Sequence, residues 1–222
     1  MIMKDFTFYV VGCGGTGSLL ARDLPQLLMH TNHRMVLIDG DTVEEKNIKR
    51  QSFQTQDIGV NKAIALARKI NTFYGIRCEA IDQYITAGEL LVRIQDDANT
   101  PVILGCVDNN STRKILEQTY EACGNAVYID SANSEYSGNV YVSAMRHGVR
   151  IGPLRGKTYQ FEEDTGPTEK SCQARAAAGN VQYFVTNIRM AACVLEHCFN
   201  LISDESFVVG VTNVDRFAEV HR

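Results

Sequence analysis

The sequence predicts a single α/β domain with a Rossmann-like, doubly wound sheet, and two observations carry this prediction. First, the apolar run FTFYVV at 6–11 leads straight into the glycine-rich turn GCGGTG at 12–17 and then into a helical pattern. Second, the next strand-like run ends in an acid, Asp39, roughly 20 residues beyond the turn. A strand, a G-x-G-x-x-G turn, a helix, a second strand and an acid are typical of a nucleotide-binding βαβ unit.

Each glycine of this turn has an expected physical role. Gly12 permits the tight turn, Gly14 lets the backbone approach a nucleotide, and Gly17 lets the following helix pack closely on the strand. Gly15 belongs to the same turn, and we expect all four glycines at the nucleotide site. Asp39 is placed to accept hydrogen bonds from ribose hydroxyls. A glycine turn without a ligand is the alternative, and the flanking strand and acid disfavour it.

The expected elements of the first half follow in order along the chain. Strands are expected at 6–11, 34–38, 77–85, 101–107 and 126–129, and helices at 18–30, 57–74, from 86 onward and at 111–123. Pro25 has no amide proton and should kink the first helix. Asp57 is the expected cap of the second helix, and Thr86 and Glu89 fit a capping box for the third. The run PVILGCV at 101–107 is typical of a buried parallel strand.

The pattern changes in the second part of the chain. We expect one domain over 1–222, with a nucleotide-binding half at 1–135 and a half at 136–222 that contains antiparallel strands, an exposed loop and a C-terminal helix. Within the latter, a strand is expected at 139–144, a long loop at 148–172, a helix at 181–202 and a terminal strand or extension at 206–220.

Composition limits the classes of partner. The chain has 222 residues, of which 45% are hydrophobic, and this suffices for one domain with a sizeable core. Its net charge of -4 indicates no basic face, so nucleic acid is not an expected partner. The apolar stretch at 183–202 contains Arg189, Glu196 and His197 and predicts a packed helix, not a membrane span. Seven cysteines without an export signal favour reduced thiols in the cytoplasm.

The segment DGDTVEEKNIKRQ at 39–51 carries more polar groups than a dehydrogenase needs. Asn47 and Arg50 are one helical turn apart, and Lys62 follows in the first turn of the next helix. With Asp39 and Asp41 beside them, an amide, a guanidinium and an ammonium near the glycine turn would suit a triphosphate. On charge alone, these basic residues would be interpreted as solvated surface charges.

A second candidate site follows the buried strand at 101–107. Ligands of open α/β sheets bind beyond the carboxyl ends of the strands, so Asp108 stands where Mg²⁺ bridging nucleotide phosphates could be held. Asn109 could contact the nucleotide, although Asn109 or Asn110 could equally cap the next helix. Arg113, within that helix, could simply pair with an acid.

The motifs GCGGTG, DGDTVEEKNIKRQ, DIGVNKA and GCVDNNSTR, in this order, resemble those of the ThiF/MoeB/E1-like superfamily that activates ubiquitin-like proteins. The resemblance covers about 6–142. The stretch EDTGPTEKSC at 163–172 and the following helix with Gln182 and Asn187 are similar to the PRTRC-system ThiF branch.

The resemblance implies ATP-dependent adenylation of the C-terminal glycine carboxylate of a small β-grasp protein. By motif position Gly14 would approach the nucleotide, Asp39 would hold the ribose, Asn47, Arg50 and Lys62 would contact the phosphates, and Asp108 would hold Mg²⁺. Arg50 and Asp108 are the expected catalytic residues. The chemistry fits, because a carboxylate attacking a phosphate needs its negative charge neutralised and no general base.

The family resemblance also raises the question of a covalent intermediate. Cys172 could accept the activated carboxyl as a thioester or acyl disulfide, or it could be an inert thiol. The remaining cysteines are expected in the core, with Cys13 as a possible exception because its turn faces the nucleotide. Many family members bind a structural Zn²⁺ through paired C-x-x-C motifs, which this chain lacks, so no zinc is predicted.

Two alternatives stay open. A nicotinamide-dependent oxidoreductase would explain the glycine turn and Asp39 but would leave Asn47, Arg50, Lys62 and Asp108 without a purpose. The second alternative is a nucleotide-binding scaffold that has kept the fold and has no catalytic activity. We also expect a homodimer that uses the strand-rich second half as its interface, because the sheet would otherwise expose an edge.

Overall fold

The computed structural model describes residues 5–161, 163, 184–203, 207–215 and 219–222. Its strands are β1 (Phe6–Val11), β2 (Arg34–Ile38), β3 (Cys78–Ile81), β4 (Thr100–Gly105), β5 (Ala126–Asn133), β6 (Gly138–Arg146), β7 (Val149–Ile151), β8 (Gly210–Val214) and β9 (Glu219–His221). Its helices are α1 (Gly15–Asp23), α2 (Pro25–Leu28), α3 (Lys62–Tyr74), α4 (Ala87–Gln95), α5 (Asn110–Glu121), α6 (Arg155–Thr158) and α8 (Phe184–Ser203).

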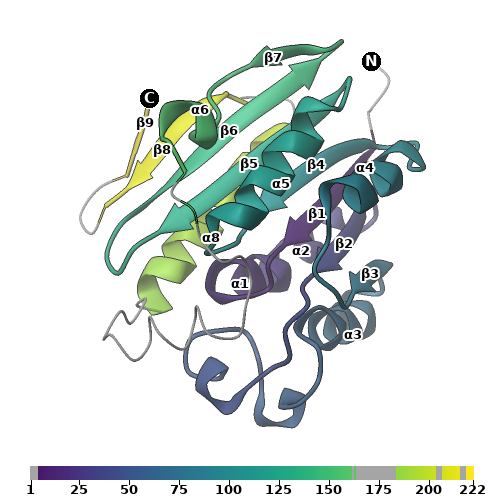
Figure 1. Cartoon of the computed structure of the whole chain (residues 1–222). Coiled ribbons are helices and arrows are strands. Elements are labelled where there is room, and N and C mark those ends of the chain that lie inside the picture. The colour runs from purple at the N-terminus through teal and green to yellow at the C-terminus, as the bar shows by residue number, and fades with distance from the viewer. Residues whose placement is uncertain (1–4, 162, 164–183, 204–206, 216–218) are drawn as a thin grey trace.

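All these strands belong to one sheet, with the order β3-β2-β1-β4-β5-β6-β8-β9 and β7 paired to β6 (Figure 1). Strands β3, β2, β1, β4 and β5 pair in parallel, and every pairing beyond β5 is antiparallel. The predicted fold class is therefore confirmed, with a parallel N-terminal part and antiparallel strands in the C-terminal part.

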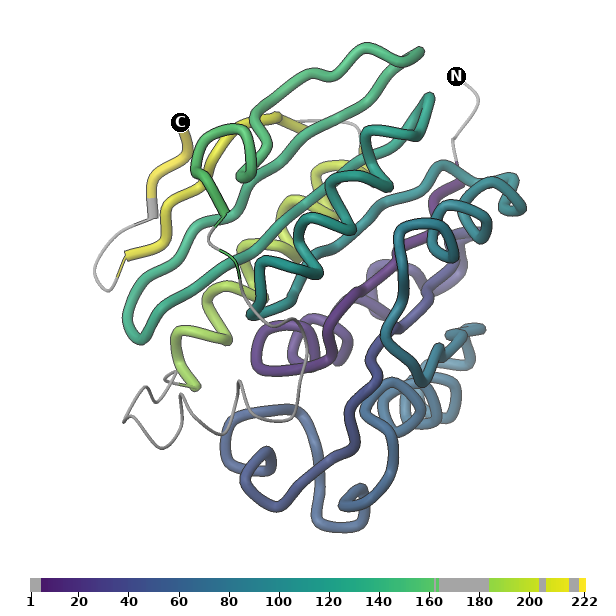
Figure 2. Tube along the Cα trace, viewed as in Figure 1, coloured from purple at the N-terminus to yellow at the C-terminus, as the bar shows by residue number. Residues whose placement is uncertain are grey.

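Helices cover both faces of the sheet, as the trace in Figure 2 shows. The alternation of β1 explains the two layers: Phe8 and Val10 face the cluster built with α1, α3 and α8, whereas Tyr9 and Val11 face the cluster built with α4 and α5. Because β1 is buried along its whole length, its sequence is largely apolar, with Thr7 as the polar exception, and does not alternate.

Several predicted elements need correction. The expected helix at 18–30 begins earlier, at Gly15, and is divided at Leu24 into α1 and α2, with Pro25 opening the second helix. The expected strand at 77–85 ends at Ile81. The expected loop at 148–172 contains β7 and α6 in its described part. The expected terminal strand or extension at 206–220 contains β8 and the start of β9 in its described part.

The predicted cap of α3 is wrong. Asn61 caps this helix, because its Oδ1 accepts a hydrogen bond from the Ile64 amide at 3.1 Å. Asp57 instead closes a short 3₁₀ turn by accepting the Gln54 amide, and it pairs with Lys69. The capping box of α4 is confirmed, since Thr86 and Glu89 accept each other's amide hydrogen bonds at 3.3 and 2.9 Å.

The described cysteines behave as small core residues. Cys13, Cys78, Cys123, Cys193 and Cys198 are buried and Cys106 is half-buried, and none of the six forms a disulfide. Cys13 is fully enclosed, and burial raises the pKa of its thiol well above the ordinary value. Its side chain therefore points into the core, although its backbone belongs to the glycine turn.

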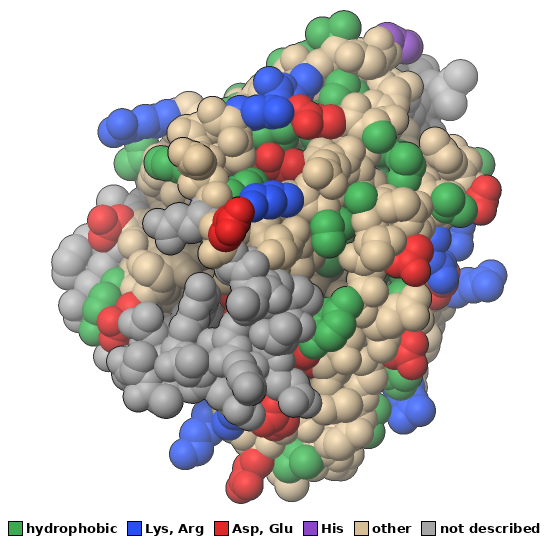
Figure 3. All heavy atoms as spheres, viewed as in Figure 1, with side chains coloured by type: hydrophobic (Ala, Val, Ile, Leu, Met, Phe, Trp, Pro, Cys, Tyr) green, Lys and Arg blue, Asp and Glu red, His purple; other side chains and the backbone are tan. Residues whose placement is uncertain are grey.

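Two surface properties bear on the expected partners. On the face drawn in Figure 3, the described positive and negative side chains are interspersed and gather into no basic patch. Among the described helices, none combines the length and the apolar character needed to cross a bilayer.

Candidate functional site

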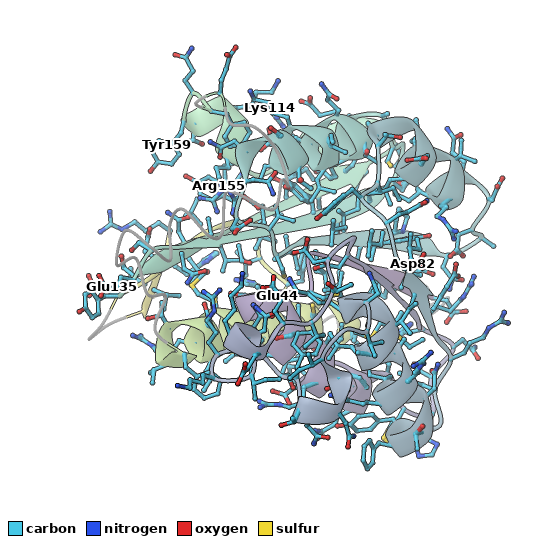
Figure 4. All side chains as sticks on the ribbon, turned by 60° about the horizontal axis from the view of Figure 1, so that its bottom comes forward. Glu44, Asp82, Lys114, Glu135, Arg155 and Tyr159 are labelled. Atoms are coloured by element: carbon cyan, nitrogen blue, oxygen red, sulfur yellow. The ribbon has the colours of Figure 1, made fainter. Side chains whose placement is uncertain are left out.

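A cavity of about 550 Å³ opens at the carboxyl edge of the parallel strands. Its walls come from the ends of β1, β2 and β5, from the segments that follow β1, β2, β3, β4 and β5, and from the N-terminal parts of α1, α3 and α5. Figure 4 looks onto this region: Asp82, after β3, and Glu135, after β5, lie toward opposite ends of it. Lys114 and Arg155 lie on the side of the sheet that carries α5, and Glu44 lies on the other side. The cavity thus occupies the place where open α/β sheets bind ligands.

The glycine turn forms one wall of the cavity. Gly12 has a φ of +88°, and a Cβ there would lie 2.7 Å from the Cys106 carbonyl oxygen. A Cβ on Gly17 would lie 1.8 Å from the Gly12 carbonyl oxygen, so the first turn of α1 can take only glycine at this position. A Cβ on Gly14 would meet nothing closer than 4.0 Å, which leaves this backbone open toward the cavity. Gly15, which also lines the cavity, is instead needed by α8, because its Cβ would lie 2.4 Å from Asn187 Nδ2.

The acid at the end of β2 reaches the same wall. Asp39 lines the cavity, its Oδ2 accepts the Cys13 amide at 2.6 Å, and its Oδ1 accepts the Asp41 amide at 2.8 Å. Burial raises the pKa of Asp39, and Lys62 and the two amides oppose this increase only in part. Each carboxylate oxygen can still accept a further hydrogen bond, as a ribose hydroxyl would require.

A second acid holds the lysine of the site. Lys62, buried at the start of α3, donates from Nζ to Asp41 Oδ2 at 2.7 Å, and the Tyr84 hydroxyl donates to Asp41 Oδ1. Burial would raise the pKa of Asp41, but the charge of Lys62 and both hydrogen bonds outweigh it and lower the pKa. All three residues line the cavity, so the predicted Asp41 and Lys62 lie together with Tyr84, which the sequence analysis did not single out.

Asn47 and Arg50 differ in their position relative to the cavity. Asn47 is buried beside the cavity wall and not on it: its Oδ1 accepts the Glu44 amide at 2.8 Å, and its carbonyl oxygen accepts the Arg50 amide at 3.0 Å. Arg50 and its neighbour Gln51 do line the cavity. Within the part of the chain that the structure describes, the Arg50 guanidinium pairs with no carboxylate. Asn47 therefore shapes the short turn that presents Arg50.

The residues after β4 form the opposite wall. Asp108 is exposed and lines the cavity. Asn109 also lines it, and its Oδ1 caps α5 by accepting the Thr112 amide at 2.8 Å, which confirms the capping alternative for this residue. Arg113 is buried and pairs with an acid, Asp130, at 3.3 Å.

Sequence reasoning missed the network around Asp130. This fully buried carboxylate pairs with Arg113 and with Arg155 from α6, and Arg155 also donates to Asn139 Oδ1 and lies 4.5 Å from the centre of the Tyr141 ring. Arg113 in turn donates to the carbonyl oxygens of Val107 and Ser131, at the cavity wall. The run DSANS at the end of β5 was the available signal, because polar residues at the end of a parallel strand mark a ligand edge.

Two residues named in the sequence analysis lie outside the part of the chain that the structure describes, namely Cys172 and Gln182. In the described ranges no group of three His, Cys, Asp or Glu side chains is placed to hold a metal ion, and the predicted lack of structural zinc stays a prediction.

A family model decides where the chain belongs: the model described as "ThiF family" matches residues 3–215, nearly the whole chain. The chain belongs to the ThiF family. The prediction of a ThiF-like chain is thereby confirmed, and the narrower PRTRC assignment stays a prediction.

Curated relatives are named ubiquitin-like modifier-activating enzyme 5. The Oryza sativa protein is 29% identical over 144 residues, which cover 60% of this chain and 33% of the relative, and the Drosophila pseudoobscura protein is 31% identical over 158 residues, which cover 66% and 38%. The chain thus spans little more than a third of the length of these relatives.

Solved structures share the fold. Matches include PaaA, with a TM-score of 0.69 at 18% identity, covering 98% of this chain and 63% of that one. They also include E. coli MccB with ATP, with a TM-score of 0.66 at 16% identity, covering 99% and 64%. MccB in complex with N-formylated MccA has a TM-score of 0.71 at 15% identity and covers 98% and 64%.

Proposed function

We propose that this ThiF-family chain is an adenylating enzyme, which activates the C-terminal glycine carboxylate of a small ubiquitin-like β-grasp protein with ATP. One observation carries the proposal: Gly14, Asp39, Arg50, Lys62 and Asp108 line a single cavity at the carboxyl edge of the sheet. The names of the curated relatives and the ATP bound to MccB support the same class of reaction.

In this proposal each residue has a part. Asp39 receives the ribose hydroxyls, and the open backbone at Gly14 lets the phosphates approach the N-terminus of α1, whose dipole favours negative charge. Lys62, now held by Asp41, and Arg50 supply positive charge at the phosphate end. Asn47 acts through the turn that presents Arg50 and not through direct contact.

In the reaction, a carboxylate oxygen of the protein substrate bonds to the α-phosphorus of ATP. The bond from that phosphorus to the bridging oxygen breaks, and pyrophosphate leaves with the electron pair. The products are an acyl adenylate and pyrophosphate. Because the attacking carboxylate is already ionised at neutral pH, the site needs no general base, and its task is to neutralise negative charge.

Mg²⁺ fits the residues present. Asp108 offers an exposed carboxylate at the cavity wall, and one carboxylate suits an ion that takes most of its ligands from phosphate and water. When bound, the ion would reduce the charge of the triphosphate. Asp108 is the residue that would hold it.

The test is the exchange of labelled pyrophosphate into ATP in the presence of a β-grasp protein that ends in glycine. We expect exchange by the wild type and a decrease of at least about 100-fold in Asp108→Asn and Arg50→Met. Lys46→Met is the matched control, because Lys46 is an exposed lysine of the same segment that pairs with Glu44. No exchange by the wild type, or full exchange by Asp108→Asn, would favour a silent scaffold, and binding of NAD without binding of ATP would favour an oxidoreductase.

Two finer parts of the proposal have separate tests. If Cys172 accepts the acyl group, Cys172→Ser retains pyrophosphate exchange but loses a thiol-sensitive adduct with the substrate on non-reducing gels. If the chain is a homodimer through its antiparallel half, sedimentation at micromolar concentration gives twice the 24.7 kDa mass of the chain, and a monomer would contradict this part alone.

A further inference from the structure

Tyr84 lies in the segment that follows β3, next to the end of β2 in the sheet order. This segment lines the cavity with Gln83, Tyr84, Ile85 and Thr86. It stands on the side of Asp39 away from β1, whereas the glycine turn and α1 stand on the other side. A nucleotide with its ribose at Asp39 and its phosphates at the glycine turn therefore directs its base toward Tyr84.

The Tyr84 ring is held in place from two directions. A Cβ built on Gly40 would lie 2.8 to 2.9 Å from Cγ, Cδ1 and Cδ2 of Tyr84, so the face of the ring rests directly on the Gly40 backbone. The hydroxyl donates to Asp41 Oδ1, which fixes the far end of the same side chain. Gly40 is thus needed by the aromatic ring, and the ring spans the stretch between the two acids of the site.

Despite these contacts, Tyr84 is 48% exposed as a residue, and it lines the cavity. A fixed aromatic ring with an open surface offers a base a stacking partner that needs little further ordering. Other exposed aromatic side chains, such as Phe73 on α3, do not line the cavity.

We propose that Tyr84 determines base selectivity: its ring stacks on the purine of the nucleotide, while its hydroxyl keeps Asp41 against Lys62. This inference rests on the proposed function, because it places ATP in the same cavity. It goes further by assigning the recognition of the base to one side chain. A purine presents a larger stacking surface than a pyrimidine, so the ring favours ATP over CTP or UTP.

The experiment compares dissociation constants by titration calorimetry for ATP, CTP and inorganic tripolyphosphate, which has no base. In Tyr84→Leu we expect the affinity for ATP to decrease about tenfold and the preference for ATP over CTP to shrink. Binding of tripolyphosphate should change by the same factor in Tyr84→Leu as in Tyr84→Phe, because both variants lose the hydroxyl that holds Asp41. A variant that merely disturbed the structure of the site would weaken ATP and tripolyphosphate alike.

Two controls sharpen the result. Tyr84→Phe keeps the ring and loses the hydroxyl, so its ratio of ATP to tripolyphosphate affinity should equal that of the wild type. Phe73→Leu removes an 80% exposed ring on α3 and should leave all three constants unchanged. If the wild type binds ATP and Tyr84→Leu preserves the ATP to tripolyphosphate ratio, the role of Tyr84 is wrong and the proposed function stands. If the wild type binds no ATP, both fail.

Discussion

Two ion-pair clusters of this sheet, one in the segment after β2 and one on β5, differ in how far water can reach their carboxylates. In the parallel half, Asp41 is 41% exposed and pairs with Lys62 at the wall of an open cavity. On β5, where the parallel strands meet the antiparallel ones, Asp130 is fully buried and its carboxylate is enclosed by Arg113 and Arg155. Both clusters consist of an acid and cations, yet only the first leaves room for a ligand to replace the carboxylate as partner of the cation.

The difference teaches that the surroundings of an ion pair, and not its composition, indicate its role. A carboxylate that water can reach is able to release its lysine to a phosphate at small cost, because solvent hydrates it. A buried carboxylate cannot lose a partner without leaving uncompensated charge. We therefore assign the Asp130 network to holding α5, α6 and β5 together, and the Asp41 pair to the ligand site.

The largest loss of stability is expected when the buried cluster of Asp130, Arg113 and Arg155 loses one arginine. Arg155→Met should lower the free energy of unfolding by about 3–5 kcal/mol, because Asp130 stays buried with part of its charge unbalanced. Lys62→Met should cost less, about 1–2 kcal/mol, because Asp41 can be hydrated and Asp39 keeps its hydrogen bonds from the Cys13 and Asp41 amides. Urea denaturation of both variants measures the difference, and equal losses would show that the comparison between the two clusters is wrong.

A second variant tests whether the glycine turn sets the geometry of the parallel half. Gly17→Ala should destabilise the protein by about 3 kcal/mol or more, because the new methyl group would lie 1.8 Å from the Gly12 carbonyl oxygen and α1 would have to move. Thermal unfolding gives the stability, and a circular dichroism spectrum shows whether the fold is retained. A loss below about 1 kcal/mol would mean that the turn adapts easily.

The antiparallel half should also carry an acid-sensitive contact. His197 on α8 is buried, its Nε2 lies 3.0 Å from Thr212 Oγ1, and that hydroxyl lies 2.8 Å from His221 Nδ1. Burial, together with the charge of His221, lowers the pKa of His197 from 6.5 to about 4. Between these two values the unfolded chain binds more protons than the folded chain, so stability falls as the pH decreases through this window.

The effect reaches at most about 3 kcal/mol between pH 7 and pH 4. His197→Gln should flatten this part of the curve of unfolding free energy against pH. His30→Asn, at an exposed histidine with a φ of 61° that asparagine tolerates, should leave it unchanged. An identical slope in wild type and His197→Gln would remove His197 as the cause.

The smallest effect has the opposite sign. Gly88 lies in the first turn of α4, and a Cβ there would meet nothing within 4 Å. Gly88→Ala should raise the free energy of unfolding by about 0.5–1 kcal/mol through helix propensity alone. Chemical denaturation measures this increase in the free energy of unfolding. Compared with Gly17→Ala, the variant shows that the fold requires glycine at position 17 but not at position 88.

Local patterns in the sequence were enough to predict much of the parallel half. The apolar runs of β1, β2 and β4, the glycine turn and the Thr86–Glu89 capping box depend on contacts between residues close in the chain or on burial that the run itself displays. The order of strand, turn, helix, strand and acid placed Asp39 and Asp108 at one edge, because parallel strands all end there.

What only the tertiary structure decided are contacts between residues far apart in sequence. The pairing of Asp130 with Arg155, the packing of Asn187 on Gly15 and the placement of Tyr84 over Gly40 each join segments that have no local relation. For the same reason, Asn61 and not Asp57 caps α3: either side chain could accept the amide hydrogen bond, and the packing of the preceding turn selected one. A single sequence displays propensity and burial pattern, but the partner of a buried polar side chain is fixed by the free energy of the whole packed fold.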